Sequence, residues 1–303
     1  MSSSQTGLAD AQRNTQTQAA PRSFSWAWLG VVPFFIFAVA FLVLPALSLF
    51  VGSFQDRAGN FTLDNVSGLF QPFILDAYWL SIRVSLVTAV GGALFGFLLA
   101  YASIMGGLPP FVRSALMTFS GVASNFAGVP LSFAFIATLG RAGLVSVLLA
   151  SVFGLDVYDM GFNLYTFWGL SFTYMYFQFP LMVLIIAPAL DGLKKEWREA
   201  SENLGATTWQ YWQYIAIPVL WPSLLGATIL LFGNAFGAYA TAYALTGGTL
   251  NLVPIVIGAQ IRGDVLNNPG LGYALALGMV VIMAISIALY TLLQRRTARW
   301  LRA

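Results

Sequence analysis

Few residues in this sequence are of types that catalyse reactions. The 303 residues include no histidine and no cysteine, which removes the commonest general base, the commonest metal ligand and any thiolate nucleophile. Catalysis would have to depend on carboxylates, lysines or tyrosines, and the 11 acidic residues do not cluster. A Gly-x-x-x-x-Gly-Lys-Ser/Thr run, which would hold nucleotide phosphates, is absent from the sequence. The residue types therefore favour a binding function over catalysis.

One stretch, residues 198–222 (REASENLGATTWQYWQYIAIPVLWP), concentrates charged, aromatic and glycine residues between two apolar segments. Over 191–203 the spacing predicts a helix with an apolar side. That side carries Leu193, Trp197, Ala200 and Leu204.

Gly205 is expected to end that helix in a left-handed conformation, and Thr207 or Thr208 to cap a second short helix. The second helix carries Trp209 and Trp212, and Pro218 is expected to begin a membrane helix. We therefore predict two helices around a glycine corner, lying across the membrane face and suited to docking a protein.

A second set of candidates is the polar side chains inside apolar segments, where an unpaired polar group is costly. Asn234 and Tyr239 lie five residues apart, so on one helix they would point about 140° apart, and Asn234 is the better candidate for contact with a solute. The alternative role for each such residue is a hydrogen bond to a neighbouring helix. The candidates for a translocation pathway are Asn125, Gln178, Asn234 and Tyr239.

Composition decides the class of protein that holds these residues. The chain is 58% hydrophobic and 8% charged, with a mean hydropathy of +0.78, whereas a soluble domain carries about 25% charged residues. The net charge of +3 argues against nucleic-acid binding. The sequence therefore predicts an all-α, polytopic membrane protein in contact with lipid.

Six segments are long and apolar enough to cross a membrane as helices. They cover about 27–50, 78–102, 114–139, 163–187, 219–244 and 271–293. The apolar run 144–155 is too short to cross and is predicted to lie on the membrane surface. Residues 51–77 and 245–270 are predicted to be moderate outer loops.

The resulting organisation has four parts. Residues 1–25 form a disordered cytoplasmic tail, 26–77 the first membrane helix and outer loop, 78–293 a core of five further helices with a loop at about 191–218, and 294–303 a basic tail. Lysine and arginine divide ten to four between the two sides, which places both termini and the 191–218 loop in the cytoplasm.

The loop resembles a known family. Glu199-Ala200-Ser201, Gly205 after three residues, and Ile215-Ala216-Ile217-Pro218 after nine more match the EAA motif of membrane permease subunits of binding-protein-dependent ABC importers. Ser201 and Ile217 depart conservatively from the motif. The resemblance covers about 78–293 and is closest to permeases of the polyamine, opine and phosphonate group.

This resemblance implies a six-helix type I permease of the bacterial inner membrane. It implies two cytoplasmic ATPase subunits, a second permease of the same or a related sequence, and a periplasmic or lipid-anchored solute-binding protein. ATP and magnesium would be bound by the ATPases, with no cofactor in this chain. The implied coupling residues are Glu199, Ala200, Ser201, Gly205, Thr207, Trp209, Trp212, Ile215 and Pro218.

The solute implied by the resemblance is a polyamine or a related opine or phosphonate, with ferric iron, an oxyanion or thiamine as alternatives. A channel or secondary transporter is a distant alternative, because it predicts buried charges or an inverted repeat, whereas the predicted spans contain almost no charge and show no repeat. A membrane enzyme would need clustered acidic or histidine residues at the surface, which this sequence lacks.

The predicted orientation can be tested by labelling, because the chain has no cysteine of its own. A cysteine introduced at Asn203 should be shielded from an impermeant thiol reagent added outside the cell, and one at Asn267 should react. The reverse pattern would contradict the orientation.

Overall fold

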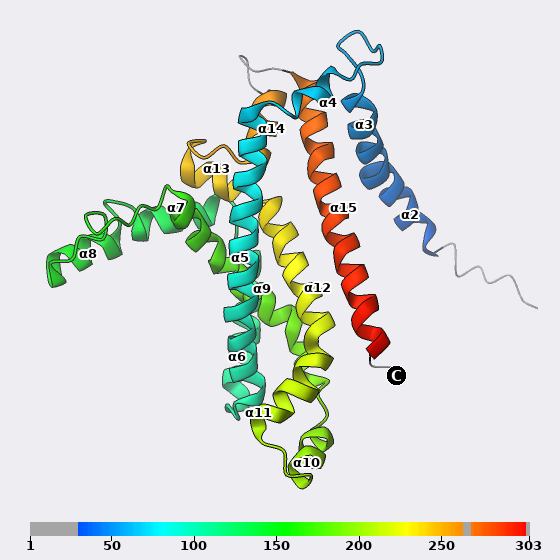
Figure 1. The fold of residues 1–303 in the computed structure, drawn as a ribbon. Helices are drawn as coiled ribbons and strands as arrows, with labels where there is room; N and C mark the ends of the chain where they lie inside the picture. Colours follow the sequence, from blue (N-terminus) through cyan, green and yellow to red (C-terminus); the bar gives the residue numbers. More distant parts are fainter. Residues whose placement is uncertain (1–29, 263–267, 301–303) are drawn as a thin grey trace, which may run out of the picture. The chain divides into compact units, whose positions relative to one another are not determined.

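The computed structural model describes residues 30–262 and 268–300 (Figure 1). The expected tail 1–25, Asn267 and the last three residues lie outside the described residues. The described residues are 79% helical, and the only pairing of extended backbone among them is one antiparallel bridge between Gln55 and Phe61. This confirms the all-α prediction.

Contacts divide the chain into two compact units, residues 1–48 and 49–303, and each is considered by itself. The first unit contains α2 (Val32–Ala38), the π-helical turn η2 (Val39–Val43) and the start of α3 (Leu44–Ser53). With the end of α3, these helices form the first candidate membrane span, Val32–Ser53.

The second unit holds the remaining elements. In chain order they are α4 (Asp64–Gly68), α5 (Pro72–Met105), α6 (Pro110–Asn125), α7 (Val129–Leu139), α8 (Leu144–Phe153), α9 (Phe167–Asp191), α10 (Lys195–Asn203), α11 (Thr208–Tyr211), η3 (Trp212–Ala216), α12 (Ile217–Phe236), α13 (Ala240–Thr246), α14 (Val253–Arg262) and α15 (Pro269–Trp300).

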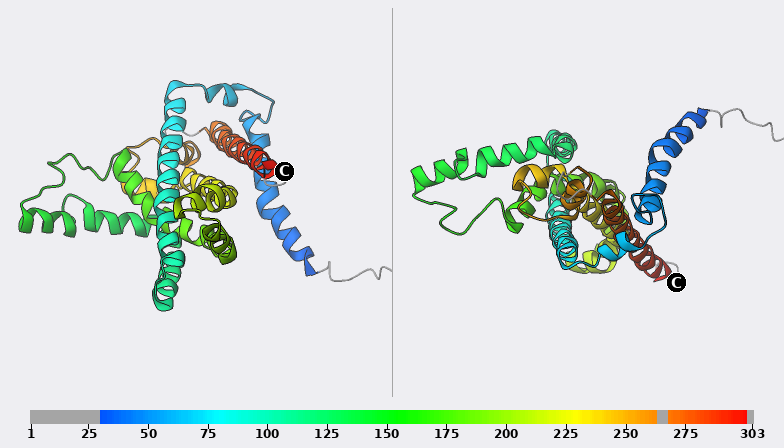
Figure 2. Two further views of the ribbon diagram at one scale, coloured as in Figure 1. Left: turned by 60° about the horizontal axis from the view of Figure 1, so that its bottom comes forward. Right: turned by 90° about the horizontal axis from the view of Figure 1, so that it is seen from above.

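Long helices connect two ends of this unit. Helices α10 and α11 lie at one end and α4, α13 and α14 at the other, with α5, α12 and α15 running between them (Figure 1). We call these the α10 end and the α14 end. Helices α7 and α8 follow one another and extend sideways from α5 (Figures 1 and 2).

Six helical segments in the described residues are long and apolar enough to cross a membrane, which confirms the predicted number. They are Val32–Ser53, Pro72–Met105, Val129–Phe153, Phe167–Asp191, Thr208–Phe236 and Pro269–Arg295. Helix α15 continues to Trp300, through most of the segment expected to form a basic tail.

The predicted third span, 114–139, is wrong as a single helix. The chain breaks between α6 and α7 at Gly128, whose φ of 76° and ψ of −149° are open to glycine but strained for other residues. The run expected on the membrane surface does form a helix, α8, and its place in the membrane stays a prediction. The outer segment 245–270 also differs from a plain loop, because it contains α14.

Close contact between α5 and α9 organises the core. Small residues at Gly92, Gly96 and Ala100 of α5 lie in one buried row. A side chain at Gly96 would begin 2.5 Å from Cβ of Met182 and 2.8 Å from the backbone oxygen of Phe179. Helix α9 also packs on α6 and α12, so it occupies the centre of the unit.

This packing predicts that Gly96→Ala destabilises the protein. Neither the Met182 Cβ nor the α9 backbone can move without separating the helices, so we expect a loss of about 1–3 kcal/mol. Gly121→Ala in α6 is the matched control, because nothing lies within 4 Å of the added methyl group. Thermal unfolding of the two variants in detergent measures the difference, and equal midpoints would contradict the packing argument.

Candidate functional site

The segment with the EAA-like motif forms the α10 end of the second unit. Helix α9 ends at Asp191, and the chain turns through Gly192 before α10 begins at Lys195. The single helix predicted over 191–203 is therefore wrong. Leu193 is buried in the core, and Lys194 has an extended ψ of 134°, which interrupts the helix.

Helix α10 exposes most of its side chains. Glu199 and Ala200 are exposed, whereas Ser201 is buried and its hydroxyl donates to the carbonyl of Arg198 at 2.7 Å. Leu204, which the spacing places on the apolar side of the helix, is 89% exposed, so this apolar side is not buried as a whole. Since Trp197 is half-buried and Ser201 buried, these two residues mark the inward side instead.

Two ion pairs stiffen the exposed side of α10. Lys195 lies 3.4 Å from Glu199, and Arg198 lies 2.9 Å from Glu202. The hydrogen bond with Glu202 raises the pKa of Arg198 above its ordinary value. Each pair joins residues four apart on a solvated helix, so each contributes little to global stability.

Gly205 forms the predicted corner. Its φ is +79°, the amide of Ala206 donates to the carbonyl of Ser201 at 3.0 Å, and the amide of Gly205 donates to that of Glu202 at 2.9 Å. These two bonds form the Schellman arrangement that closes a helix on a left-handed residue. The corner is therefore built from local backbone bonds.

Thr207 caps the next helix, as one of the two predicted alternatives. Its hydroxyl accepts from the amide of Gln210 at 3.3 Å, and the Gln210 side chain accepts from the amide of Thr207 at 2.7 Å. This reciprocal pair is a capping box. Trp209, in the first turn, is 72% exposed.

The helix that begins after Thr207 continues into the membrane span, so Pro218 does not begin a new helix. The prediction of a separate second helix is wrong, because its residues form the first turns of the candidate span Thr208–Phe236. The π-helical turn η3 ends two residues before Pro218. A widened turn there can absorb the missing proline donor and the crowding of its ring against the preceding turn.

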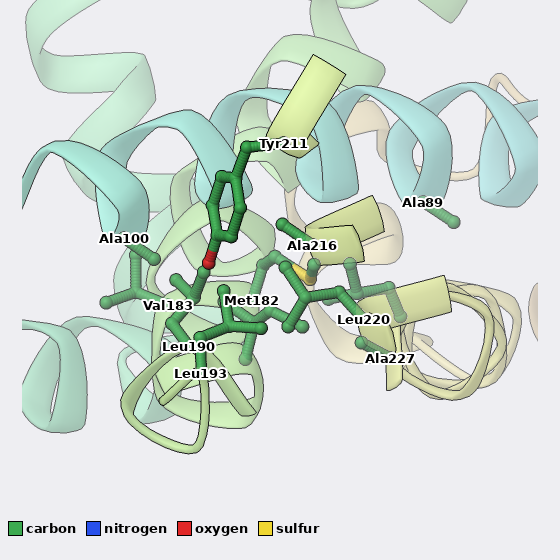
Figure 3. Close-up of a cluster of buried hydrophobic side chains, with 12 residues drawn as sticks. Ala89, Ala100, Met182, Val183, Leu190, Leu193, Tyr211, Ala216, Leu220 and Ala227 are labelled. Atoms are coloured by element: carbon green, nitrogen blue, oxygen red, sulfur yellow. The ribbon is translucent and has the colours of Figure 1, made fainter. Parts of the chain in front are cut away.

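Tyr211 fixes the start of this long helix to the core. Its ring is 4% exposed and points among Val183, Leu190 and Leu193 (Figure 3). Trp212 meets the ring of Tyr101 edge-on at 5.1 Å between centroids. Trp212 and Ile215 are half-buried against this cluster, so they support the α10 end from inside.

A pocket opens between α10 and the start of the long helix. Its volume is about 640 Å³. Its walls include Ala200, Ser201, Leu204, Gly205, Tyr214 and Ile215.

An ion pair ties the start of α6 to the end of α9. Arg113 of α6 donates to both carboxylate oxygens of Asp191 at 2.9 and 2.7 Å.

The candidate pathway residues lie in two kinds of environment. Asn125 is exposed at the last position of α6, where its amide donates to the carbonyl of Gly121 at 2.8 Å. Asn234 is exposed near the end of α12. Gln178 is fully buried, and its amide donates to the carbonyl of Leu231 at 2.9 Å.

Tyr239 lies outside the helix that holds Asn234, because α12 ends at Phe236. The predicted angle of about 140° between the two side chains on one helix therefore does not apply. The Tyr239 ring stacks on Tyr243 at 5.4 Å between centroids. It also lies against Gly258, where an added Cβ would be 3.2 Å from the ring.

Thr241, one of the polar residues within the fifth apolar segment of the sequence, joins the two breaks in the helices. Its hydroxyl accepts from the amide of Gly128 at 2.7 Å, and its carbonyl accepts from the hydroxyl of Ser132 at 2.8 Å. Tyr174 donates to the carbonyl of Ala238 at 2.8 Å. The end of α6, with Asn125, and the end of α12, with Asn234, therefore precede breaks that are bonded together.

Known proteins similar to this chain are transport permeases. The spermidine/putrescine transport system permease protein PotB of Haemophilus influenzae is 25% identical, over 84% of this chain and 90% of that protein. The sulfate transport system permease protein CysT of Escherichia coli is 27% identical, over 58% of this chain and 60% of that protein. A probable sulfate permease of Chlorella vulgaris is 26% identical, over 73% of this chain and 78% of that protein.

The fold matches that of solved importers. A bacterial ABC transporter involved in the import of the acidic polysaccharide alginate superposes with a TM-score of 0.71 at 16% identity, covering 96% of this chain and 99% of that one. The similarity confirms the predicted permease fold.

A family profile supplies the assignment. It is described as "Binding-protein-dependent transport system inner membrane component", and it matches residues 77–299, which include the α10 end, both joined helix breaks and the last five candidate spans from Ala77 onward. This chain therefore belongs to the family of inner membrane components of binding-protein-dependent transport systems, as a multi-pass ABC permease.

Proposed function

We propose that this chain is the membrane-spanning permease subunit of an ATP-driven importer for a small hydrophilic solute. The observation that carries the proposal is the α10 end, where a Schellman corner at Gly205 and a capping box at Thr207 present the EAA-like segment away from the core. A simple loop would need neither device. The ten-to-four division of lysine and arginine supports a cytoplasmic position for this end.

The α10 end has the chemistry of a docking surface for an ATPase subunit. Glu199 supplies charge, Leu204 and Trp209 supply exposed apolar area, and the adjacent pocket can receive side chains. Large exposed apolar groups of this kind mark protein contacts. In the proposed assembly, two ATPase subunits bind ATP and magnesium, and this chain supplies no cofactor.

The exposed amides at helix ends support pairing with a second permease. Asn125 and Asn234 lie in apolar helices, where exposure of an amide to lipid is unfavourable. A second permease, of the same or a related sequence, would enclose this face as a polar pathway. A solute-binding protein would deliver the solute at the α14 end.

The relatives support two solute classes. PotB is a spermidine/putrescine permease and CysT a sulfate permease, so a polyamine, which the sequence analysis favoured, and an oxyanion both remain candidates. The family shared by these proteins supports the transport function without selecting the solute.

Gly205→Val tests the docking role. Nothing lies within 4 Å of an added Cβ, so the substitution causes no steric clash there. Its energetic cost of about 1–2 kcal/mol comes from the positive φ and destabilises the conformation of the corner. The variant should insert in the membrane but lose ATPase subunits during purification. Gly192→Ala, at a residue with φ of −74°, is the control and should keep them. Full ATPase binding and uptake by Gly205→Val would refute the coupling role.

Glu199→Ala tests the charged contact separately. Its pair with Lys195 is exposed, so the fold should be unaffected. A charge-assisted contact with the ATPase is worth about 1.5–3 kcal/mol, so the variant should bind ATPase more weakly, by roughly ten- to a hundredfold, and show less solute-stimulated ATP hydrolysis. Unchanged affinity would exclude Glu199 from the docking contact.

Asn234→Leu tests the pathway. Because Asn234 is exposed, the variant should assemble with normal thermal stability while uptake falls. Leu230→Val, one turn earlier on the same exposed side of α12, is the control and should transport normally. Gln178→Leu should instead lower thermal stability, since it removes the bond to Leu231. Normal uptake by Asn234→Leu would remove this residue from the pathway.

A further inference from the structure

A second pocket lies at the α14 end, opposite the proposed ATPase surface. Its volume is about 540 Å³, and its walls come from the start of α5, from α13 and from α14. A smaller pocket of about 310 Å³ adjoins it and shares Tyr239, Gly258 and Arg262. We call the two together the tyrosine–arginine pocket. No Asp or Glu is among the described residues that line it.

Arg262 brings an unengaged positive charge to this pocket. Two other arginines stack on rings: Arg83 lies 5.1 Å from the centre of Phe167 and Arg141 5.6 Å from that of Tyr158. Within the described residues, Arg262 has neither a ring nor a carboxylate partner. Its place in the last turn of α14 suits the helix dipole, but that explains neither the pocket nor the aromatic wall.

Two tyrosines and an asparagine complete the polar wall. The stacked rings of Tyr239 and Tyr243 both line the pocket, and Gly258 leaves room for Tyr239 against α14. Asn251 lines the same pocket and is exposed. Among the described residues, neither tyrosine hydroxyl nor the Asn251 side chain has a hydrogen-bond partner, so several unpaired polar groups belong to residues that line one largely apolar cavity. This combination is typical of a small-molecule site.

We propose that the tyrosine–arginine pocket binds an acidic group of the transported solute, a carboxylate, sulfate or phosphonate. The proposal rests on the proposed import function and selects among its solutes. A guanidinium matches a planar or tetrahedral anion with paired donors, and tyrosine hydroxyls add further donors. A polyamine would meet repulsion from Arg262 and find no carboxylate in the described walls. The pocket therefore favours the anionic members of the candidate group.

Labelling of a single cysteine tests the charge of the pocket. Ala259 lines it one helical turn from Arg262, so Ala259→Cys reports on that charge. In the full-length chain within the assembled transporter, we compare the rates of an anionic sulfonate thiol reagent and a cationic trimethylammonium one. Arg262→Gln should lower the anionic-to-cationic rate ratio about threefold to tenfold. Arg141→Gln, which removes a charge that does not line the pocket, should leave the ratio unchanged, as should Arg262→Lys.

Protection from labelling tests binding itself. Sulfate, methylphosphonate and succinate are added separately at constant ionic strength, with chloride as the reference and spermidine as the cationic probe. At least one of the three anions should slow labelling in a saturable way, and Arg262→Gln should abolish that protection.

Protection by spermidine, protection by none of the three anions, or protection that survives Arg262→Gln would overturn the proposal. So would an unchanged rate ratio in Arg262→Gln. Protection by the solute-free binding protein with none by the anions would assign the pocket to protein docking, and would also overturn it. Labelling requires neither ATP hydrolysis nor uptake, so failure here is distinct from failure of the Gly205→Val test of coupling.

Discussion

Every backbone amide and carbonyl inside a membrane must find its hydrogen-bond partner within the protein. This constraint explains the least regular parts of the structure. Where α6 and α12 end, Thr241 and Tyr174 supply bonds that water would otherwise supply, to Gly128 and Ala238. The two breaks can therefore persist in an apolar environment, one with a bond from Thr241 of α13 and the other with a bond from Tyr174 of α9.

Prolines inside spans also leave a backbone carbonyl without its donor. At two of them a π-helical turn precedes the proline. The π-helical turns η2 and η3 end at Val43 and Ala216, two residues before Pro45 and Pro218. Each lets the helix pass a residue that has no donor and whose ring crowds the preceding turn. The helix that begins after Thr207 is consequently continuous across Pro218, whereas the break at Gly128 divides α6 from α7.

Local features were predictable from the sequence, and distant ones were not. The number of spans, the Gly205 corner and the Thr207 cap depend on residues within a few positions of one another. The break at Gly128 is bonded to Thr241, 113 residues later, a contact that local periodicity does not reveal. Similarly, the burial of Ser201 in place of Leu204 depends on how Leu193 and Tyr211 pack, which helical spacing alone does not reveal.

Continuity of the long helix gives the proposed coupling a physical route. The 29 residues of Thr208–Phe236 span about 44 Å at 1.5 Å per residue, from the capped turn beside Gly205 to the break beside Asn234. Tyr211 fixes the first turn to the α5–α9 core, and the Arg113–Asp191 pair ties α6 to α9 at the same end. A displacement of the α10 end would thus act on the ends of both α6 and α12. Thr241 of α13 bonds Gly128 and Ser132 at the start of α7, so the segments that follow these two helix ends are joined to each other, close in sequence to Asn125 and Asn234.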